Sequence, residues 1–221
     1  MSTRKQLIDI YHRLSAHFGP QRWWPAQSPL EVMVGAVLTQ NTNWKNVEKA
    51  IANLKQAGLL DAGRLYQIDP EDLAQFIRPA GYYNLKALRL KALIAWLWET
   101  YDGDQQAIRE RPADLLREQL LAIRGIGPET ADSILLYALD KPVFVVDAYT
   151  ARILGRHRLI SPPADYSEIQ SLFENALPRE VRLYNEYHAL LVCCGKEFCR
   201  PKARCDGCPL NPLPHDIEEN F

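Results

Sequence analysis

The sequence predicts an all-α protein. Apolar residues recur at the three- and four-residue spacing of amphipathic helices in nearly every segment, and only residues 142–146 have the composition of a strand. Of the 221 residues, 47% are hydrophobic and 24% are charged, which is typical of a globular protein with a sizeable core. This composition excludes disorder, collagen and a coiled coil as descriptions of the whole chain.

The helices follow one another along the chain. Residues 4–18 place Leu7, Ile10 and Leu14 on one face, and Gly19-Pro20 ends this helix. Residues 30–39 are apolar on nearly all sides, which favours a central helix. Further helices are predicted at residues 43–56, 70–77, 84–101, 112–122, 128–139, 147–155, 165–176 and 180–194. We interpret residues 142–146 as an isolated extended connector.

Charge and hydropathy restrict the location and the partners. The 26 Lys and Arg residues balance 27 Asp and Glu residues, which excludes a general polycation but not a local basic face. No apolar run reaches the roughly 18 residues that span a bilayer, and the N-terminus lacks the apolar stretch of a secretory signal. We therefore expect a cytoplasmic protein with no membrane partner.

The cysteines form one cluster near the C-terminus. Such clustering, with no cysteine elsewhere in the chain, indicates a metal site rather than a secreted disulfide framework. Four thiolates suit an iron–sulfur cluster or zinc. The five residues are Cys193, Cys194, Cys199, Cys205 and Cys208.

A glycine turn separates two apolar helices at Gly125-Ile126-Gly127, and Pro128 opens the second helix. Backbone N–H groups in such a turn, with the positive end of the following helix dipole, favour an anion such as a DNA phosphate. These contacts would hold the DNA backbone without reading its sequence. A plain helix–turn–helix corner would contain the same glycines.

Four separated blocks together resemble the helix-hairpin-helix DNA glycosylases of the endonuclease III superfamily. The resemblance covers roughly residues 28–210. The blocks are Val37-Leu38-Thr39-Gln40-Asn41-Thr42, then Gly81-Tyr82-Tyr83-Asn84-Leu85-Lys86-Ala87, then the hairpin with the following Val145-Val146-Asp147, and the C-terminal cysteines.

The resemblance implies two helical domains with the active-site cleft between them. One is a six-helix domain at residues 29–141 that contains the helix-hairpin-helix. The other joins residues 1–28 to residues 142–221 and carries an iron–sulfur cluster loop. The implied partner is double-stranded DNA containing a damaged base, bound by a monomer, which places the cytoplasmic protein at the nucleoid.

Asp147 corresponds to the catalytic aspartate of the family. A carboxylate there would stabilise the positive charge that develops on the sugar and orient the attacking water. Asp147 also suits the N-cap of the helix that follows it. Glu129 stands where bifunctional members have a lysine, and a carboxylate cannot form their imine. We therefore expect a monofunctional glycosylase without AP lyase activity, in which Glu129 is either an electrostatic helper in the catalytic site or a first-turn helix acid.

Aromatic residues resemble those of the endonuclease III-like 3-methyladenine glycosylases. Those enzymes share a Trp-Trp-Pro segment, here Trp23-Trp24-Pro25, a Thr-Gln-Asn-Thr loop followed by an aromatic, here Trp44, and the glutamate. An alkylated purine is cationic and stacks well between aromatic faces. We assign Trp24, Trp44 and Pro25 to the base pocket and Trp23 to packing. The alternative is that all three tryptophans only pack.

DNA contacts are assigned on the same resemblance. Gln40 corresponds to the intercalating glutamine and Tyr82 to the wedge residue, whereas Tyr83 is expected to be structural. Phosphate contacts are expected from the backbone of Gly125, Ile126 and Gly127 and from Lys86. A local basic patch would add Arg78, Arg89 and Lys91.

The cysteine spacing departs from the family pattern, whose fourth ligand falls on Pro214 here. Cys194 is expected to replace it, with Cys193 as the competitor. The expected cofactor is a [4Fe–4S] cluster, with zinc or a metal-free loop as alternatives. Its ligands would be Cys194, Cys199, Cys205 and Cys208.

The expected function is base excision repair, with hydrolysis of the N-glycosidic bond of alkylated purines such as 3-methyladenine. One alternative is an endonuclease III-like glycosylase for oxidised or mismatched pyrimidines. An alternative of another class is a non-catalytic binder of damaged DNA.

Overall fold

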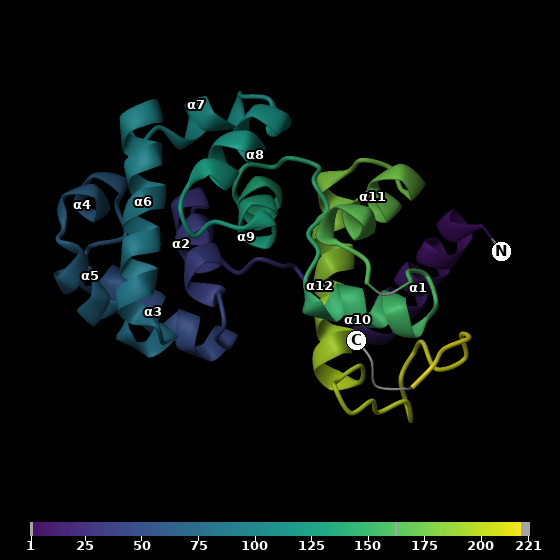
Figure 1. The fold of residues 1–221 in the computed structure, drawn as a ribbon. Helices are drawn as coiled ribbons and strands as arrows, with labels where there is room; N and C mark the ends of the chain where they lie inside the picture. The colour runs from purple at the N-terminus through teal and green to yellow at the C-terminus, as the bar shows by residue number, and fades with distance from the viewer. Residues whose placement is uncertain (1, 162, 218–221) are drawn as a thin grey trace. The chain divides into compact units, whose positions relative to one another are not determined.

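The computed structural model describes residues 2–161 and 163–217. Every regular element in this part of the chain is helical, so the predicted all-α class is confirmed (Figure 1). Residues 142–146 form no strand and connect two helices, as the sequence predicts. No helix in the described ranges combines the length and apolar character needed to cross a membrane. The chain divides into two compact units, one at Trp24–Lys141 and one that joins the residues up to Trp23 to those from Pro142 onward.

The Trp24–Lys141 unit is built around α2 (Pro29–Thr39), which packs against α3 (Trp44–Gln56) and α6 (Tyr83–Tyr101). All residues from Leu30 to Leu38 are buried, which confirms the prediction of a central helix. The remaining elements are α4 (Ala62–Gln67), α5 (Pro70–Phe76), the 3₁₀ turn η1 (Arg78–Ala80), α7 (Gln105–Arg109), α8 (Ala113–Ala122), α9 (Pro128–Ser133) and the π-helical turn η2 (Ile134–Ala138).

Three features of this unit differ from the sequence prediction. Helices α4 and α7 were not expected, because each is too short to show a helical period. Each begins at an aspartate cap: the carboxylate of Asp61 accepts the N–H of Arg64, and that of Asp104 accepts two N–H groups. The single helix expected at residues 128–139 changes to π-helical geometry after Ser133.

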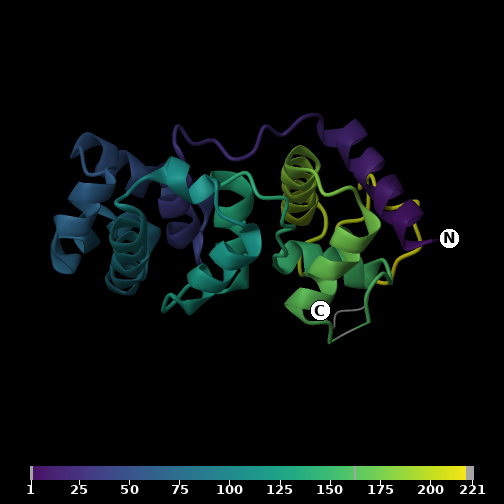
Figure 2. The same cartoon turned by 90° about the horizontal axis from the view of Figure 1, so that it is seen from above.

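The second unit contains α1 (Thr3–Phe18), α10 (Ala148–Arg156), α11 (Tyr166–Ala176) and α12 (Val181–Glu197), followed by an irregular loop. Helix α12 is its centre and packs on both α10 and α1. Figure 2 looks almost along α12 and shows α1 and α11 next to each other beside it. The buried hydroxyl of Tyr187 donates to the carbonyl of Leu7 at 2.7 Å, which ties α12 to α1.

Candidate functional site

The turn of the hairpin depends on one glycine. Gly125 has φ 89°, a left-handed backbone conformation that residues other than glycine adopt only at an energetic cost. A Cβ at this position would lie 2.6 Å from Cγ of Arg89, so the turn also leaves no room for a side chain. Ile126 is buried beneath the turn, whereas Gly125 and Gly127 are exposed. The exposed backbone of the turn lies directly before α9, which begins at Pro128.

A buried ion pair fixes α8 against α9 below this turn. Arg117 Nε donates to Oδ1 of Asp132 at 2.7 Å, and Arg117 Nη2 donates to Oδ2 at 3.1 Å. The Asp132 side chain is fully buried, and that of Arg117 is 30% exposed. Two parallel bonds give this pair a fixed geometry, so it sets the angle at which the two helices leave the turn.

Gln40 connects the turn to two other elements. Its Nε2 donates to the carbonyl of Gly125 at 3.1 Å and to the hydroxyl of Thr130 at 3.0 Å. Its Oε1 accepts from Nη1 of Arg89 at 2.5 Å. The side chain predicted to intercalate into DNA is therefore hydrogen-bonded to the hairpin and to α6 in this structure. Its insertion stays a prediction.

Tyr82 lies between η1 and α6 and is 72% exposed. Its backbone is left-handed, with φ 47° and ψ 32°, and it precedes the first residue of α6. An aromatic ring is thus presented to solvent from a strained backbone position. Tyr83 instead packs under Arg78, whose guanidinium carbon lies 5.6 Å from the ring centre.

The expectation that Lys86 contacts a phosphate is wrong. Lys86 is 1% exposed, and its Nζ donates to the carbonyls of Leu38 at 2.8 Å and Ala80 at 2.7 Å. Burial, with a smaller contribution from the charge of Arg89, lowers the pKa of Lys86 to about 8. Lys86 therefore joins α6 to the ends of α2 and η1. Lys91 is engaged similarly and donates to the carbonyls of Leu65, Tyr66 and Ile68.

Three aromatic rings form a cluster in the Trp24–Lys141 unit. The ring centre of Trp24 lies 5.1 Å from that of Trp44, edge to face, and 5.4 Å from that of Tyr137. Trp24 precedes α2, Trp44 is the first residue of α3, and Tyr137 belongs to η2. Gly35 permits the packing, because a Cβ there would lie 3.1 Å from Cζ2 of Trp24. Pro25 is exposed next to this cluster.

Glu31 holds the segment that carries Trp24. Its Oε2 accepts the N–H of Gln27 at 2.9 Å, and its Oε1 pairs with Nζ of Lys55 at 2.7 Å. Trp23 belongs to the other unit, where Nζ of Lys196 lies 5.5 Å from its ring centre. The sequence did not single out Tyr137, although its position on the helix after the hairpin was a usable signal.

Asp147 is the N-cap of α10. Its Oδ1 accepts the N–H of Thr150 at 2.7 Å and the Thr150 hydroxyl at 2.9 Å, and its Oδ2 lies 3.7 Å from Nε2 of His188. Burial alone would raise the pKa of Asp147, but the electrostatic interaction with His188 and the hydrogen bonds from Thr150 outweigh it and lower the pKa. The result is a nearly buried, oriented and ionised carboxylate.

The candidate site residues also include Glu129, which the sequence singled out, and His188, which it did not. Glu129 lies in the first turn of α9 and is exposed. His188 comes from α12, and sequence reasoning did not identify it. The signal available for it was weak, since His188 follows the buried Tyr184 by one helical turn and reads as a core position.

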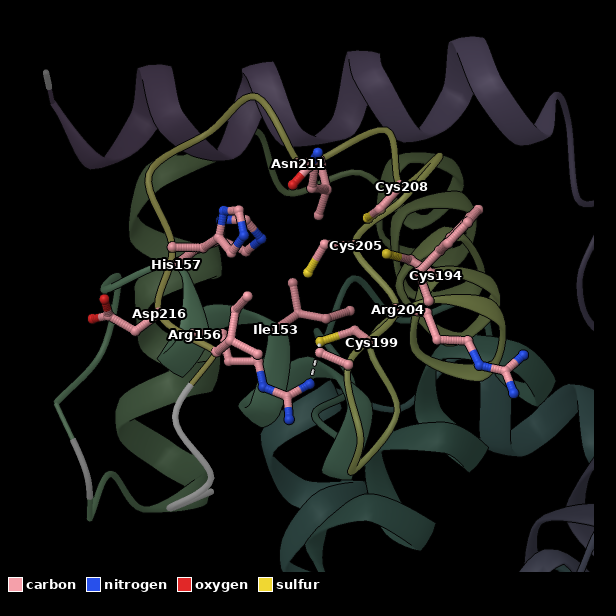
Figure 3. A pocket seen from close by; sticks show the side chains of 15 residues that line it. Ile153, Arg156, His157, Cys194, Cys199, Arg204, Cys205, Cys208, Asn211 and Asp216 are labelled. Carbon is pink, nitrogen blue, oxygen red and sulfur yellow. Dashed lines mark hydrogen bonds between the residues drawn. The ribbon is translucent and has the colours of Figure 1, made fainter.

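Four cysteines line one pocket of the C-terminal loop, and their side chains face a common space (Figure 3). Arg156 donates to Sγ of Cys199 at 3.3 Å and to the carbonyls of Arg200 and Pro201, each at 2.7 Å. Cys193 does not line the pocket; its Sγ donates to Oε1 of Gln21 at 3.0 Å. The lining cysteines are Cys194, Cys199, Cys205 and Cys208.

Four thiolates can hold an iron–sulfur cluster of the four-iron type, and four cysteines also suit zinc. In a four-iron cluster each iron takes one thiolate, so the thiolates surround the cluster rather than one point. No three His, Cys, Asp or Glu side chains within residues 2–161 and 163–217 are arranged to hold a single ion. A hydrogen bond from Cys194 lowers the pKa of Cys208 to about 6 and raises the pKa of Cys194.

Comparison with known proteins decides the family. The model of the HhH-GPD superfamily of base excision DNA repair proteins matches residues 34–179. The chain belongs to the HhH-GPD superfamily. The predicted membership of the endonuclease III-like enzymes is thereby confirmed, and this HhH-GPD protein is a DNA glycosylase of base excision repair.

The relatives of this HhH-GPD protein differ in what their names describe. It is 50% identical over 207 residues to MJ1434 of Methanocaldococcus jannaschii, which is named as a candidate DNA repair glycosylase, and the match covers 93% of this chain and 94% of that one. It is 30% identical over 181 residues to endonuclease III of Thermotoga maritima, covering 81% and 79% of the two chains.

Two solved structures have the same fold as this HhH-GPD protein. One is the H. pylori 3-methyladenine DNA glycosylase MagIII bound to 1,N6-ethenoadenine, with a TM-score of 0.76 and 31% identity, covering 89% of this chain and 98% of that one. The other is an endonuclease III–DNA complex, with a TM-score of 0.82 and 23% identity over 97% and 96% of the chains.

Proposed function

We propose that this glycosylase removes alkylated purines, chiefly 3-methyladenine, from double-stranded DNA. The observation that carries the proposal is the cluster of Trp24, Trp44 and Tyr137. N3- or N7-alkylation makes a purine cationic, and a cation over an aromatic face gains about 2 kcal/mol when it is desolvated. The similarity to MagIII, whose name describes 3-methyladenine as its substrate, supports the same base.

Asp147 is proposed as the catalytic carboxylate. Cleavage of the N-glycosidic bond develops positive charge on the sugar, and a fixed anion lowers the energy of that state. Because Thr150 and His188 hold the Asp147 carboxyl ionised, it is also suited to orient the attacking water. An alkylated purine is already a good leaving group, so the reaction needs no strong general acid. Glu129 is proposed to add negative charge to the site as an electrostatic helper.

The proposed reaction is hydrolysis without AP lyase activity. A lyase needs an amine that attacks the sugar carbon, and residue 129 is a carboxylate. Two lysines of other motifs, Lys86 and Lys141, are engaged elsewhere. Lys86 is buried on two carbonyls, and Nζ of Lys141 donates to the carbonyl of Arg109 at 2.6 Å.

DNA binding is proposed to use the backbone of the hairpin and two loop residues. The backbone N–H groups of the exposed Gly125 and Gly127 would hold phosphates, whereas the N–H of the buried Ile126, expected to do the same, donates to the carbonyl of Ile123 at 3.1 Å. The exposed ring of Tyr82 would stack on bases beside the lesion, and Gln40 would enter the space left by the extruded nucleotide. The solved endonuclease III–DNA complexes with this fold support DNA as the partner. We propose that the protein acts on it as a monomer.

A [4Fe–4S] cluster is proposed in the C-terminal loop, held by Cys194, Cys199, Cys205 and Cys208. Its role would be structural, since a cluster bound by four thiolates cross-links α12 to the loop. Arg156 already holds this loop through its bonds to Cys199 and the following carbonyls. The last turn of α12 carries Lys196, and the loop carries Arg200, Lys202 and Arg204; we propose that these side chains face phosphates.

A lesion panel tests the substrate. Purified protein is incubated with duplexes that contain 3-methyladenine, thymine glycol or a mismatched thymine, and released bases are separated from cleaved strands. The proposal predicts release of 3-methyladenine with an intact abasic strand and no borohydride-trapped adduct.

Two other outcomes would change the assignment. Activity restricted to thymine glycol or the mismatch would favour the second candidate, an oxidised- or mismatched-pyrimidine glycosylase, which the 30% identity to the Thermotoga maritima enzyme supports. Tight binding without release of any base would favour a damaged-DNA binder.

A further inference from the structure

Asp147 has a second buried partner that comes from another helix. Nε2 of His188, on α12, lies 3.7 Å from Oδ2 of Asp147, and the side chains are only 8% and 11% exposed. Helices α10 and α12 pack closely along this part of the unit, so the two residues approach across a packed interface. A polar pair enclosed in this way interacts more strongly than it would at the surface.

The two oxygens of the carboxylate are held by different elements. Oδ1 accepts both bonds from Thr150, which belong to the cap of α10. Oδ2 takes no part in that cap and faces His188. The cap therefore fixes Oδ1. The rotation of the carboxylate about that oxygen, and its ionisation, depend on the contact with α12.

Four titratable groups on α10, α11 and α12 have hydrogen-bond partners other than Asp147. On α10, Arg152 donates to the carbonyl of Cys199 at 2.7 Å, and Arg156 is bonded to the cysteine loop. On α12, Glu186 accepts the N–H of Gln21 at 2.8 Å. From α11, the hydroxyl of Tyr166 accepts the N–H of Val146 at 3.3 Å.

The charge of His188 acts on the Asp147 carboxyl, and Thr150 donates its backbone N–H and its hydroxyl to the same group. Tyr11 of α1, the other helix packed on α12, faces the ring of Tyr187.

We infer that His188 is a positioning residue for the glycosylase reaction: it holds the second oxygen of Asp147 in place and keeps this carboxylate charged. This inference rests on the proposed role of Asp147. The His188 imidazole, 3.7 Å from Oδ2, offsets the cost of burying the anion through electrostatic attraction rather than through a short hydrogen bond. Replacing it with a neutral side chain leaves the burial and removes the compensation, so the carboxyl takes up a proton more readily.

The direct test observes the carboxyl carbon of Asp147 by ¹³C NMR in the full chain during an acid titration. The resonance is assigned by its loss in Asp147→Asn. The variant is His188→Gln, with His188→Asn as the second neutral variant should the first fail to fold. The matched control is Tyr187→Phe, which removes a buried hydrogen bond to Leu7 from the same helix.

The expected result is a titration of Asp147 at higher pH in His188→Gln and an unchanged titration in Tyr187→Phe. An unchanged titration in both histidine variants would overturn the inference, whatever the substrate of the enzyme proves to be. This readout requires no catalysis, so it separates the inference from the proposed function.

The second readout is single-turnover release of 3-methyladenine against pH. We expect the rate in His188→Gln to fall roughly tenfold at neutral pH, because one electrostatic contact with an enclosed anion is lost, and the acid limb to move to higher pH. Tyr187→Phe should keep the wild-type profile. A moved titration with a wild-type rate and profile would overturn the positioning role. A moved titration with no base release from the wild type would instead contradict the proposed function.

Discussion

The ion pair between Arg117 and Asp132 offers a quantitative test of how the hairpin is held. Arg117→Ala removes both N–H donors from a carboxylate that is fully buried. Breaking a buried pair from one side costs about 3–5 kcal/mol. Because the Arg117 side chain is 30% exposed, water can enter the space it leaves, which places the expected loss near the lower end, at about 3 kcal/mol.

Thermal unfolding followed by circular dichroism measures this loss, which corresponds to a fall in melting temperature on the order of 10 °C. The diagnostic comparison is the double variant Arg117→Ala with Asp132→Asn. It removes the buried charge and should be more stable than Arg117→Ala alone.

The control for this test is Arg13→Ala, whose exposed pair with Asp9 should contribute at most about 0.5 kcal/mol. If Asp132→Asn instead lowered the stability of Arg117→Ala further, the buried charge would not be the source of the loss. The reasoning about the hairpin brace would then be refuted.

Four further predictions follow from single contacts. Cys194→Ser should lower the iron content and the blue-region absorbance of the purified protein, whereas Cys193→Ser should keep both; the reverse pattern would move the fourth ligand to Cys193. Gly35→Ala should displace Trp24 and thereby lower the release of 3-methyladenine. The free energy of unfolding should change by under about 1 kcal/mol, because alanine favours the helix more than glycine does. A wild-type rate of release would exclude Trp24 from the base pocket. Lys86→Met should destabilise the protein by about 2 kcal/mol, because the carbonyls of Leu38 and Ala80 lose their donor. The slope of log binding constant against log salt concentration should stay unchanged. A slope reduced by about one would instead identify Lys86 as a phosphate contact. The pKa of Asp147 lies below its ordinary value of 3.8, so its ionised form should stabilise the protein at neutral pH, and this stabilisation should be lost only as the pH falls through the folded-state pKa. Urea titrations at several pH values measure this loss of stability in acid, which Asp147→Asn should abolish. An unchanged loss in the variant would contradict the assignment.

Periodicity and motif order predicted much of this molecule. Residues 30–39 are apolar on nearly all sides, as expected for a helix enclosed by others, so the central position of α2 could be predicted from composition alone. The cap at Asp147 was also predictable, since capping is local and follows from residue type.

Other features depend on contacts between distant segments, which no local pattern reports. Lys86 resembles a surface lysine in sequence, and only the carbonyls of Leu38 and Ala80 draw it inside. His188 reaches Asp147 only because α12 packs on α10. Tyr137 joins the aromatic cluster only because the segment before α2 brings Trp24 next to it.

Release of 3-methyladenine from alkylated duplex DNA by the wild type and by Asp147→Asn tests the central claim most directly. Asparagine is also a good N-cap, so the substitution removes the charge and leaves the helix start intact. The account predicts release by the wild type and a loss of at least about a hundredfold in the variant, with unchanged DNA binding. Undiminished release by Asp147→Asn would contradict it.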